Sequence, residues 1–205
     1  PNLPAAKHGL HFTTPSTVWD EALPLGNGML GALVWGDGRP LRISLDRADL
    51  WDTRVVPEFS GPDYKFSVMR RWHEQGRVAD LQGVYEQPYN RAAPTKIPAG
   101  RIELEFPAAA AFRHTALDLA AAEASMAFEG GVEARFLVHA TEAFGMAHIT
   151  GGALPRVVLK APPFGGTPTD KAVEGGPRPS SLAHLGYPPP AEESGADWCA
   201  FTQQG

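Results

Sequence analysis

The sequence contains one cysteine, Cys199, in 205 residues. A single thiol excludes an internal disulfide and a zinc site built from several cysteines. The redox compartment therefore stays open, because a protein without disulfides can fold either in the cytosol or after export. Cys199 lies in an apolar stretch, so we expect a buried, unreactive thiol rather than a nucleophile.

Long apolar runs and positive charge are also scarce. No stretch approaches the roughly 20 apolar residues of a membrane-spanning helix, and no signal-peptide pattern opens the sequence. The 18 Lys and Arg residues are outnumbered by 23 Asp and Glu residues, which gives a net charge of −5 and no basic stripe. We therefore expect neither a membrane nor a nucleic acid as a partner.

Apolar residues make up 43% of the chain, and 22 glycines and 20 prolines interrupt it. This composition supports a folded core, and short strands at a spacing of about ten residues are typical of an antiparallel β-sandwich. We predict a mainly β, supersandwich-like single domain over residues 1–205. Two segments depart from this pattern: a short helical excursion at 66–86, and a glycine- and proline-rich loop at 161–197 whose composition buries little apolar area.

The strand predictions rest on alternation and on turn residues. Residues 29–35 are almost continuously apolar and residues 41–45 alternate, so we predict a hairpin whose tight turn uses positive φ angles at Gly36 and Gly38. The turn Glu129-Gly130-Gly131 favours strands rather than a helix on both sides of it. Further strands are predicted at 8–12, 101–106, 115–119, 124–128, 132–139, 146–150, 156–160 and 198–201, with Gly151-Gly152 as a turn.

The helical prediction rests on a change of period. Between residues 67 and 85, apolar side chains recur at helical spacing while charged residues occupy the other positions. Gly76 is expected to divide the segment into two short helices. The following residues, 88–100, contain three prolines and are predicted to form a loop.

The stretch from Trp19 to Trp51 combines indoles with acids. Asp46, Asp49 and Asp52 lie close to Trp51 in the sequence. Carboxylates beside an aromatic ring are what glycoside hydrolysis requires, because one acid protonates the leaving oxygen, another activates water, and the ring stacks on the sugar. In the plainer alternative the acids are solvated turn residues and the indoles fill a core or a rim.

Other chemistries find less support. The turn at residues 26–28 lacks the lysine and the following helix of a phosphate-binding loop. The seven histidines are scattered, and no nucleophile elbow of the form G-x-S-x-G is present. We therefore predict no metal and no cofactor, and we assign no catalytic residue.

Polar and aromatic residues on turns and on the proline-rich loop are candidates for contacts with a carbohydrate, because a β-scaffold displays binding groups on its loops. Ordinary loop polarity is the alternative for each of them. The predicted substrate-binding residues are Asn27, Asp46, Asp49, Trp51, Tyr89, Arg91 and Lys96.

One long phrase resembles a known family. The sequence WDEALPLGNGMLGALVWG, followed by LRISLDRADLW, is similar to the N-terminal β-sandwich of glycoside hydrolase family 95, the inverting α-L-fucosidases and their relatives. The resemblance continues more loosely through the helical excursion, PAGRIELEF, TALDL and the strand that ends in VHA. It covers about residues 16–149.

The resemblance implies an accessory role. Family 95 enzymes have Asn-Glu where this chain has Asp46-Arg47, which indicates a divergent branch. Their acid and base lie in an (α/α)6 barrel that follows the sandwich. We therefore expect the N-terminal part of a longer, secreted or periplasmic bacterial hydrolase that is inactive without its barrel, with a carbohydrate and that barrel as partners.

Two alternatives belong to other classes of protein. One is a stand-alone carbohydrate-binding module that holds a glycan at Trp51. The other is a purely structural domain with an apolar interaction surface. The chain begins without Met and ends at Gly205, which also favours a piece of a longer protein.

Overall fold

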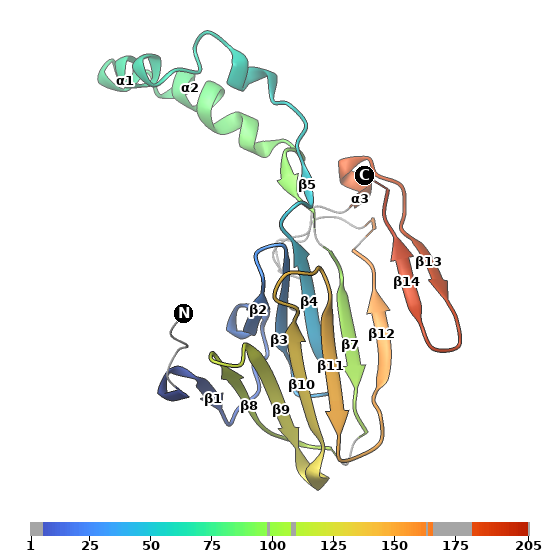
Figure 1. The fold of residues 1–205 in the computed structure, drawn as a ribbon. Coiled ribbons are helices and arrows are strands. Elements are labelled where there is room, and N and C mark those ends of the chain that lie inside the picture. The colour runs from blue at the N-terminus through green and yellow to red at the C-terminus, as the bar shows by residue number, and fades with distance from the viewer. Residues whose placement is uncertain (1–5, 98, 108–109, 163, 166–181, 205) are drawn as a thin grey trace.

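The computed structural model describes residues 6–97, 99–107, 110–162, 164–165 and 182–204. Two five-stranded antiparallel sheets face each other, which confirms the predicted mainly β, sandwich-like fold (Figure 1). The first sheet has the order β1 (Leu10–Phe12), β8 (Phe112–Asp118), β9 (Glu123–Phe128), β10 (Glu133–Val138), β11 (Gly145–Thr150). The second has the order β12 (Arg156–Lys160), β7 (Arg101–Glu105), β4 (Leu41–Arg47), β3 (Leu30–Trp35), β2 (Leu23–Gly26).

The hairpin β3–β4 confirms the predicted central turn. Its strands pair antiparallel from Leu30 opposite Arg47 to Trp35 opposite Arg42. Gly36 and Gly38 both adopt positive φ angles, 101° and 97°, which glycine tolerates without strain. The Trp35 ring is fully buried, and its indole N–H donates to the Ser44 hydroxyl at 3.0 Å.

The core lies between the two sheets. On β9 every second side chain is buried, and Ala124, Met126 and Phe128 point into the core. Phe128 stacks on Phe106, with ring centroids 4.5 Å apart. Leu41 of β4 is fully buried in the same cluster, so the predicted strands bury the faces that their alternation indicated.

Two consecutive strands belong to different sheets. The strands predicted at 146–150 and 156–160 are present as β11 and β12. They do not pair with each other, because β11 pairs with β10 and β12 pairs with β7. The connection at Gly151-Gly152 therefore carries the chain from one sheet to the other, and β11 and β12 each form the last strand of their sheet.

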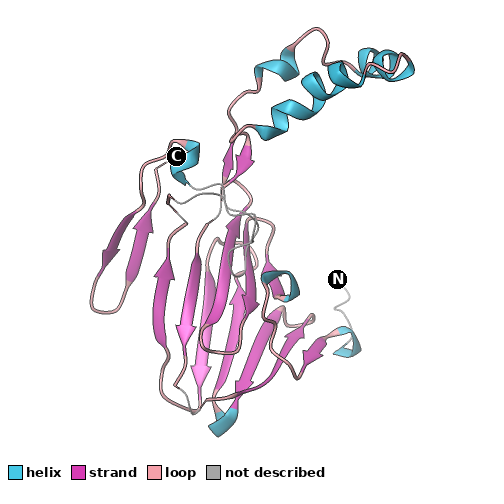
Figure 2. Ribbon diagram, turned by 180° about the vertical axis from the view of Figure 1, so that it is seen from behind, coloured by secondary structure: helices cyan, strands magenta, loops and turns pink. Residues whose placement is uncertain are grey.

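A helical arm extends from one end of the sandwich (Figures 1 and 2). Its helices α1 (Phe66–Glu74) and α2 (Val78–Leu81) lie on the two sides of Gly76, as predicted, and Trp72 is buried within the arm. None of the helices in the described residues is long and apolar enough to cross a membrane. The arm consists of η3 (Pro57–Ser60), α1 (Phe66–Glu74), α2 (Val78–Leu81), the π-helical turn η4 (Gln82–Glu86) and η5 (Gln87–Asn90).

A two-stranded ribbon joins the arm to the sandwich. It consists of β5 (Trp51–Asp52) and β6 (Thr95–Lys96), and we call it the neck. Three further short 3-10 helices are η1 (Ala6–His8), η2 (Trp19–Glu21) and η6 (Glu129–Gly131).

The C-terminal part differs from the expected loop. Within residues 161–197, α3 (Leu182–Leu185) and β13 (Ala191–Ser194) are ordered elements, while 163 and 166–181 lie outside the described residues. β13 pairs with β14 (Cys199–Thr202), close to the strand predicted at 198–201. The expectation that Cys199 is buried is wrong, because this hairpin pairs with neither main sheet and leaves the thiol exposed.

The turn between β3 and β4 makes a testable prediction about packing. A Cβ atom added at Gly38 would lie 2.5 Å from Cε1 of the buried Phe128 ring, whereas one added at Gly28, where φ is also positive, would meet nothing within 4 Å. We expect Gly28→Ala to lower the unfolding free energy by about 1–2 kcal/mol through backbone strain. Gly38→Ala should cost about 1–3 kcal/mol more through overpacking. Urea unfolding of both variants measures the difference, and equal losses would contradict the packing argument.

Candidate functional site

The neck has an open face and a buried face because its strands alternate. Trp51 pairs with Lys96 and Asp52 pairs with Thr95. The Trp51 side chain is 54% exposed, whereas Asp52 next to it is 2% exposed. Four of the seven predicted substrate-binding residues meet at or beside the open face: Asp46, Asp49, Trp51 and Lys96.

Lys96 organises the open face. Its ammonium nitrogen lies 5.7 Å from the centroid of the Trp51 ring, which is within the range of a cation–π contact. The same Nζ lies 2.8 Å from Oδ1 of Asp46 and also donates to the backbone carbonyl of Arg47. The ammonium group is therefore largely used inside the protein, and the exposed indole is the main apolar surface that this face offers to a ligand.

Asp49 forms a pair with Arg47 on the same side of the neck. The guanidinium donates from Nε to Oδ1 at 3.0 Å and from Nη2 to Oδ2 at 2.8 Å. This bidentate hydrogen bonding lowers the pKa of Asp49. Both side chains are about half exposed, so water screens the pair and it contributes little to stability.

The buried face is built around Asp52. Arg54 donates from Nε to both carboxylate oxygens at 3.0 Å and from Nη2 to Oδ2 at 2.6 Å, and the Tyr187 hydroxyl donates to Oδ2 at 2.9 Å. These hydrogen bonds, those from Arg54 above all, lower the pKa of Asp52 to about 2 despite its burial. Burial, together with the carboxylate beside it, raises the pKa of Tyr187.

This cluster fastens the C-terminal segment to the neck. Arg54 also donates from Nη2 to the carbonyl of Leu185 at 2.7 Å, at the end of α3. Beneath it, Ile97, Leu182 and Leu185 form a small buried apolar cluster. Sequence reasoning noted Asp52 among the acids but missed the cluster, because Tyr187 is 135 residues away and no local pattern links the two.

Asn27 has a structural role elsewhere. Its amide nitrogen donates to the carbonyls of His139 and Glu142 at 2.8 and 3.0 Å, and its oxygen accepts from the N–H groups of Met29 and Leu30, both at 2.9 Å. Two donors and two acceptor positions are the full capacity of an asparagine side chain. Asn27 therefore ties the β2–β3 turn to the loop after β10, and its substrate-binding role remains a prediction.

Of the two remaining candidates, Tyr89 lies in η5 of the arm and Arg91 directly follows it. Arg91 donates to the carboxylate of Glu58 and so links the beginning of the arm to its end. This ion pair lowers the pKa of Glu58. The side chain of Tyr89 lies outside the described part of the structure. The substrate-binding roles of both residues remain predictions.

The acids of the neck are poorly suited to donate a proton. A general acid in glycoside hydrolysis needs a raised pKa, whereas the pKa values of Asp49 and Asp52 are lowered by their arginine partners. Among the described residues, no group of three or more His, Cys, Asp or Glu side chains could hold a metal ion.

Two cavities lie away from the neck. One of about 410 Å³ lies between β12 and the β13–β14 hairpin. Another of about 400 Å³ opens between β1 and β2, where Phe12, Glu21 and Thr115 contribute to its walls. Among the six predicted substrate-binding residues whose side chains the structure describes, none lines either cavity.

Residues 10–143 match the family model described as "Glycosyl hydrolase family 65, N-terminal domain", which covers more than half of the chain. No curated protein matches the sequence. The matched description names family 65, so the family 95 likeness of the phrase around residues 19–51 remains a prediction.

Asn27 offers a test of its structural role. Asn27→Ala should leave two carbonyls and two N–H groups without partners and lower the unfolding free energy by about 2–4 kcal/mol. Asn27→Asp keeps the acceptor and removes the donors, so the amides of Met29 and Leu30 should stay protected in hydrogen exchange in this variant and lose protection in Asn27→Ala. A residue that serves sugar binding alone would leave unfolding and exchange unchanged without ligand.

Asp52 predicts a dependence of stability on pH. A carboxyl group whose pKa is lowered by folding stabilises the native state above its unfolded pKa of about 4, and this contribution disappears as the pH falls towards about 2. We expect Asp52→Asn to be less stable than the wild type at pH 7, and the difference to shrink between pH 4 and pH 2. Urea midpoints over this range measure it. Asp49→Asn, with an exposed carboxylate, is the matched control and should change stability little at any pH.

Proposed function

Because the chain belongs to the family of glycosyl hydrolase family 65 N-terminal domains, we propose that it is the accessory β-sandwich of an enzyme that hydrolyses O-glycosyl bonds. The match over residues 10–143 is the observation that carries this proposal. The matched residues include the phrase around Trp19 to Trp51, both strands of the β3–β4 hairpin, the neck and the whole helical arm. Fold alone would not suffice, since β-sandwiches serve many functions.

The catalytic acid and base are proposed to lie in a separate (α/α)6 barrel of the parent enzyme. The lowered pKa values of Asp49 and Asp52 support this division, because both carboxyl groups are ionised at neutral pH and neither could protonate a leaving oxygen. The sandwich is then a packing partner of the barrel. The arm and the neck, which project beyond the two sheets, are the elements that would approach it (Figure 1).

The substrate is proposed to be an α-L-fucoside or a related glycoside, on the resemblance of the phrase around residues 19–51 to family 95. The two positions that differ from family 95, Asp46 and Arg47, form ion pairs at or beside the neck. Asp46 pairs with Lys96, and Arg47 pairs with Asp49. We therefore propose a divergent branch in which these charges shape the rim of the neck. Export to the bacterial periplasm or medium is part of the same proposal.

The exposed indole favours one alternative, a stand-alone carbohydrate-binding module. A tryptophan ring that is 54% exposed beside charged groups suits stacking against the apolar face of a sugar. In this case the isolated chain binds glycans on an array, and Trp51→Ala abolishes binding. An unchanged array pattern for Trp51→Ala would remove this alternative.

Aryl glycosides test the proposed division of labour. We expect the 205-residue chain to release no nitrophenol from nitrophenyl glycosides, including the α-L-fucoside, while the full-length parent releases it. Robust release by the chain alone, lost on Asp46→Asn or Asp49→Asn, would overturn the accessory role. An inactive parent on every glycoside tested would overturn the hydrolase proposal itself.

A further inference from the structure

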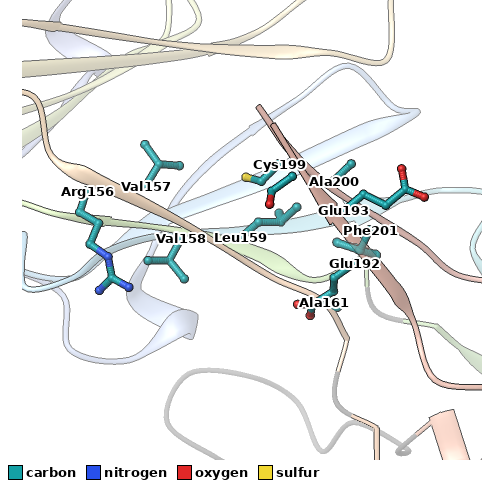
Figure 3. A pocket seen from close by; sticks show the side chains of 11 residues that line it. Arg156, Val157, Val158, Leu159, Ala161, Glu192, Glu193, Cys199, Ala200 and Phe201 are labelled. Carbon is teal, nitrogen blue, oxygen red and sulfur yellow. The ribbon is translucent and has the colours of Figure 1, made fainter. Parts of the chain in front are cut away.

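The cavity beside β12 runs along an open strand edge (Figure 3). Its walls are formed by residues 156–159 and 161 on one side, and by residues 192–194 and 199–201 of the β13–β14 hairpin on the other. A cavity over the face of a strand is lined by every second residue, because side chains alternate. Here four consecutive residues of β12 line it, and Figure 3 shows Val157 and Val158 pointing to opposite sides of the strand. The cavity therefore lies against the edge of β12, and we call it the edge groove.

The outer edge of β12 has no strand partner among the described residues. β12 pairs with β7 on its inner side and ends the sheet order. In an antiparallel sheet, alternate residues of an end strand direct their N–H and C=O groups away from the paired neighbour. Natural proteins usually protect such edges. In this strand the charges of Arg156 and Lys160 lie at the two ends, and Val157, Val158 and Leu159 lie between them.

The hairpin is held in place beside this edge. Gly100, which precedes β7, has a φ of 83°, and a Cβ atom there would lie 2.5 Å from the carbonyl oxygen of Lys160 and 3.2 Å from Cζ of Phe201. A glycine is therefore needed where the Phe201 ring packs against this backbone. This contact places the Phe201 ring of the hairpin next to the end of β12, so both walls of the edge groove belong to this chain.

The walls define the chemistry of the occupant. A strand edge requires backbone donors and acceptors, and Val157, Leu159 and Ala200 offer apolar contacts. Arg156 is paired with Glu105 at 2.9 Å. Glu192 and Glu193 have no ion-pair partner within the part of the chain that the structure describes, so the groove carries net negative charge. An extended peptide in which apolar residues alternate with basic ones fits all three requirements.

We propose that the edge groove receives an extended segment of the parent hydrolase polypeptide, which pairs with β12 as a sixth strand and lies under the β13–β14 hairpin. This inference rests on the proposed function, because the matched family consists of N-terminal domains of hydrolases. A segment of the same polypeptide is present at high effective concentration and can bind through few contacts.

A synthetic peptide tests the groove in the 205-residue chain. The probe is acetyl-Lys-Val-Lys-Val-Lys-Val-amide, and binding is followed by NMR shifts of the amides in β12 and β14. We expect saturable binding that shifts residues 156–161. In an extended peptide the N–H groups of every second residue point to the same side. N-methylation of the set that faces β12 removes the hydrogen bonds to this strand and should weaken binding at least tenfold. N-methylation of the other set should leave the affinity unchanged. Equal affinity of both methylated peptides, or no shifts in β12, would overturn strand pairing.

Charge variants test the acidic wall. Glu192→Lys should weaken binding of the peptide several-fold, because it reverses one of the two unpaired charges. Glu86→Lys makes the same change in the arm, far from the groove in the sequence, and should leave the affinity unchanged. If both variants weaken binding equally, the attraction is unspecific and the assigned groove is wrong.

The full-length hydrolase tests the source of the strand. Cys199 lines the groove and is exposed in this chain, so its alkylation rate reports on occupancy. We expect alkylation of Cys199 and amide exchange in β12 to be at least tenfold slower in the full-length enzyme than in the 205-residue chain. Equal rates would overturn the proposal even if the enzyme cleaves glycosides. Protection in an enzyme that cleaves no glycoside would uphold the groove and refute the proposed function.

Discussion

The Asp52 carboxylate is almost fully buried, so its charge must be balanced by hydrogen bonds and an opposite charge. Arg54 and Tyr187 supply them, and Arg54 also holds the carbonyl of Leu185. Through these contacts one buried anion joins the neck to the segment around α3. The two sheets have an extensive core of their own, whereas the neck and the segment around α3 are joined through this cluster and a small apolar cluster next to it.

Because successive side chains of the neck strands point to opposite sides, the neck has a buried structural face and an open face. Asp52 faces inward and is held in its ionised form, while Trp51 faces outward beside Lys96. The polar groups on the open face mostly satisfy one another: Asp46 with Lys96, and Asp49 with Arg47. What remains for a ligand is an aromatic surface with charges at its rim. Such a surface suits contact with a sugar or with a neighbouring domain better than it suits proton transfer.

The strands near the C-terminus are largely exposed. Every residue of β13 is exposed, β14 is nearly so, and β11 and β12 end their sheets. A β-sandwich that stands alone usually protects its edges with charges, bulges or covering loops. The edge of β12, which has no strand partner in the described part of the chain, is consistent with a domain whose surface is completed by other polypeptide, as membership in a family of N-terminal domains leads one to expect.

Local patterns determined much of this protein. The period of apolar residues and the glycines of the turns predicted the β3–β4 hairpin, the strands β8 to β10 and the split helical arm, because alternation and positive φ are encoded by neighbouring residues. The phrase around Trp19 to Trp51 indicated a hydrolase accessory domain. Four predicted residues did meet at the neck, since they lie near the ends of strands that the hairpin and the arm bring together.

Long-range pairing was decided by the tertiary structure alone. The bond from Tyr187 to Asp52 spans 135 residues, and that from Asn27 to His139 spans 112. The assignment of β11 and β12 to different sheets and the exposure of Cys199 are of the same kind. Each depends on which strand edges and loops meet after the sheets have packed. Periodicity records which side of a strand is buried, but it carries no information about which distant segment buries it.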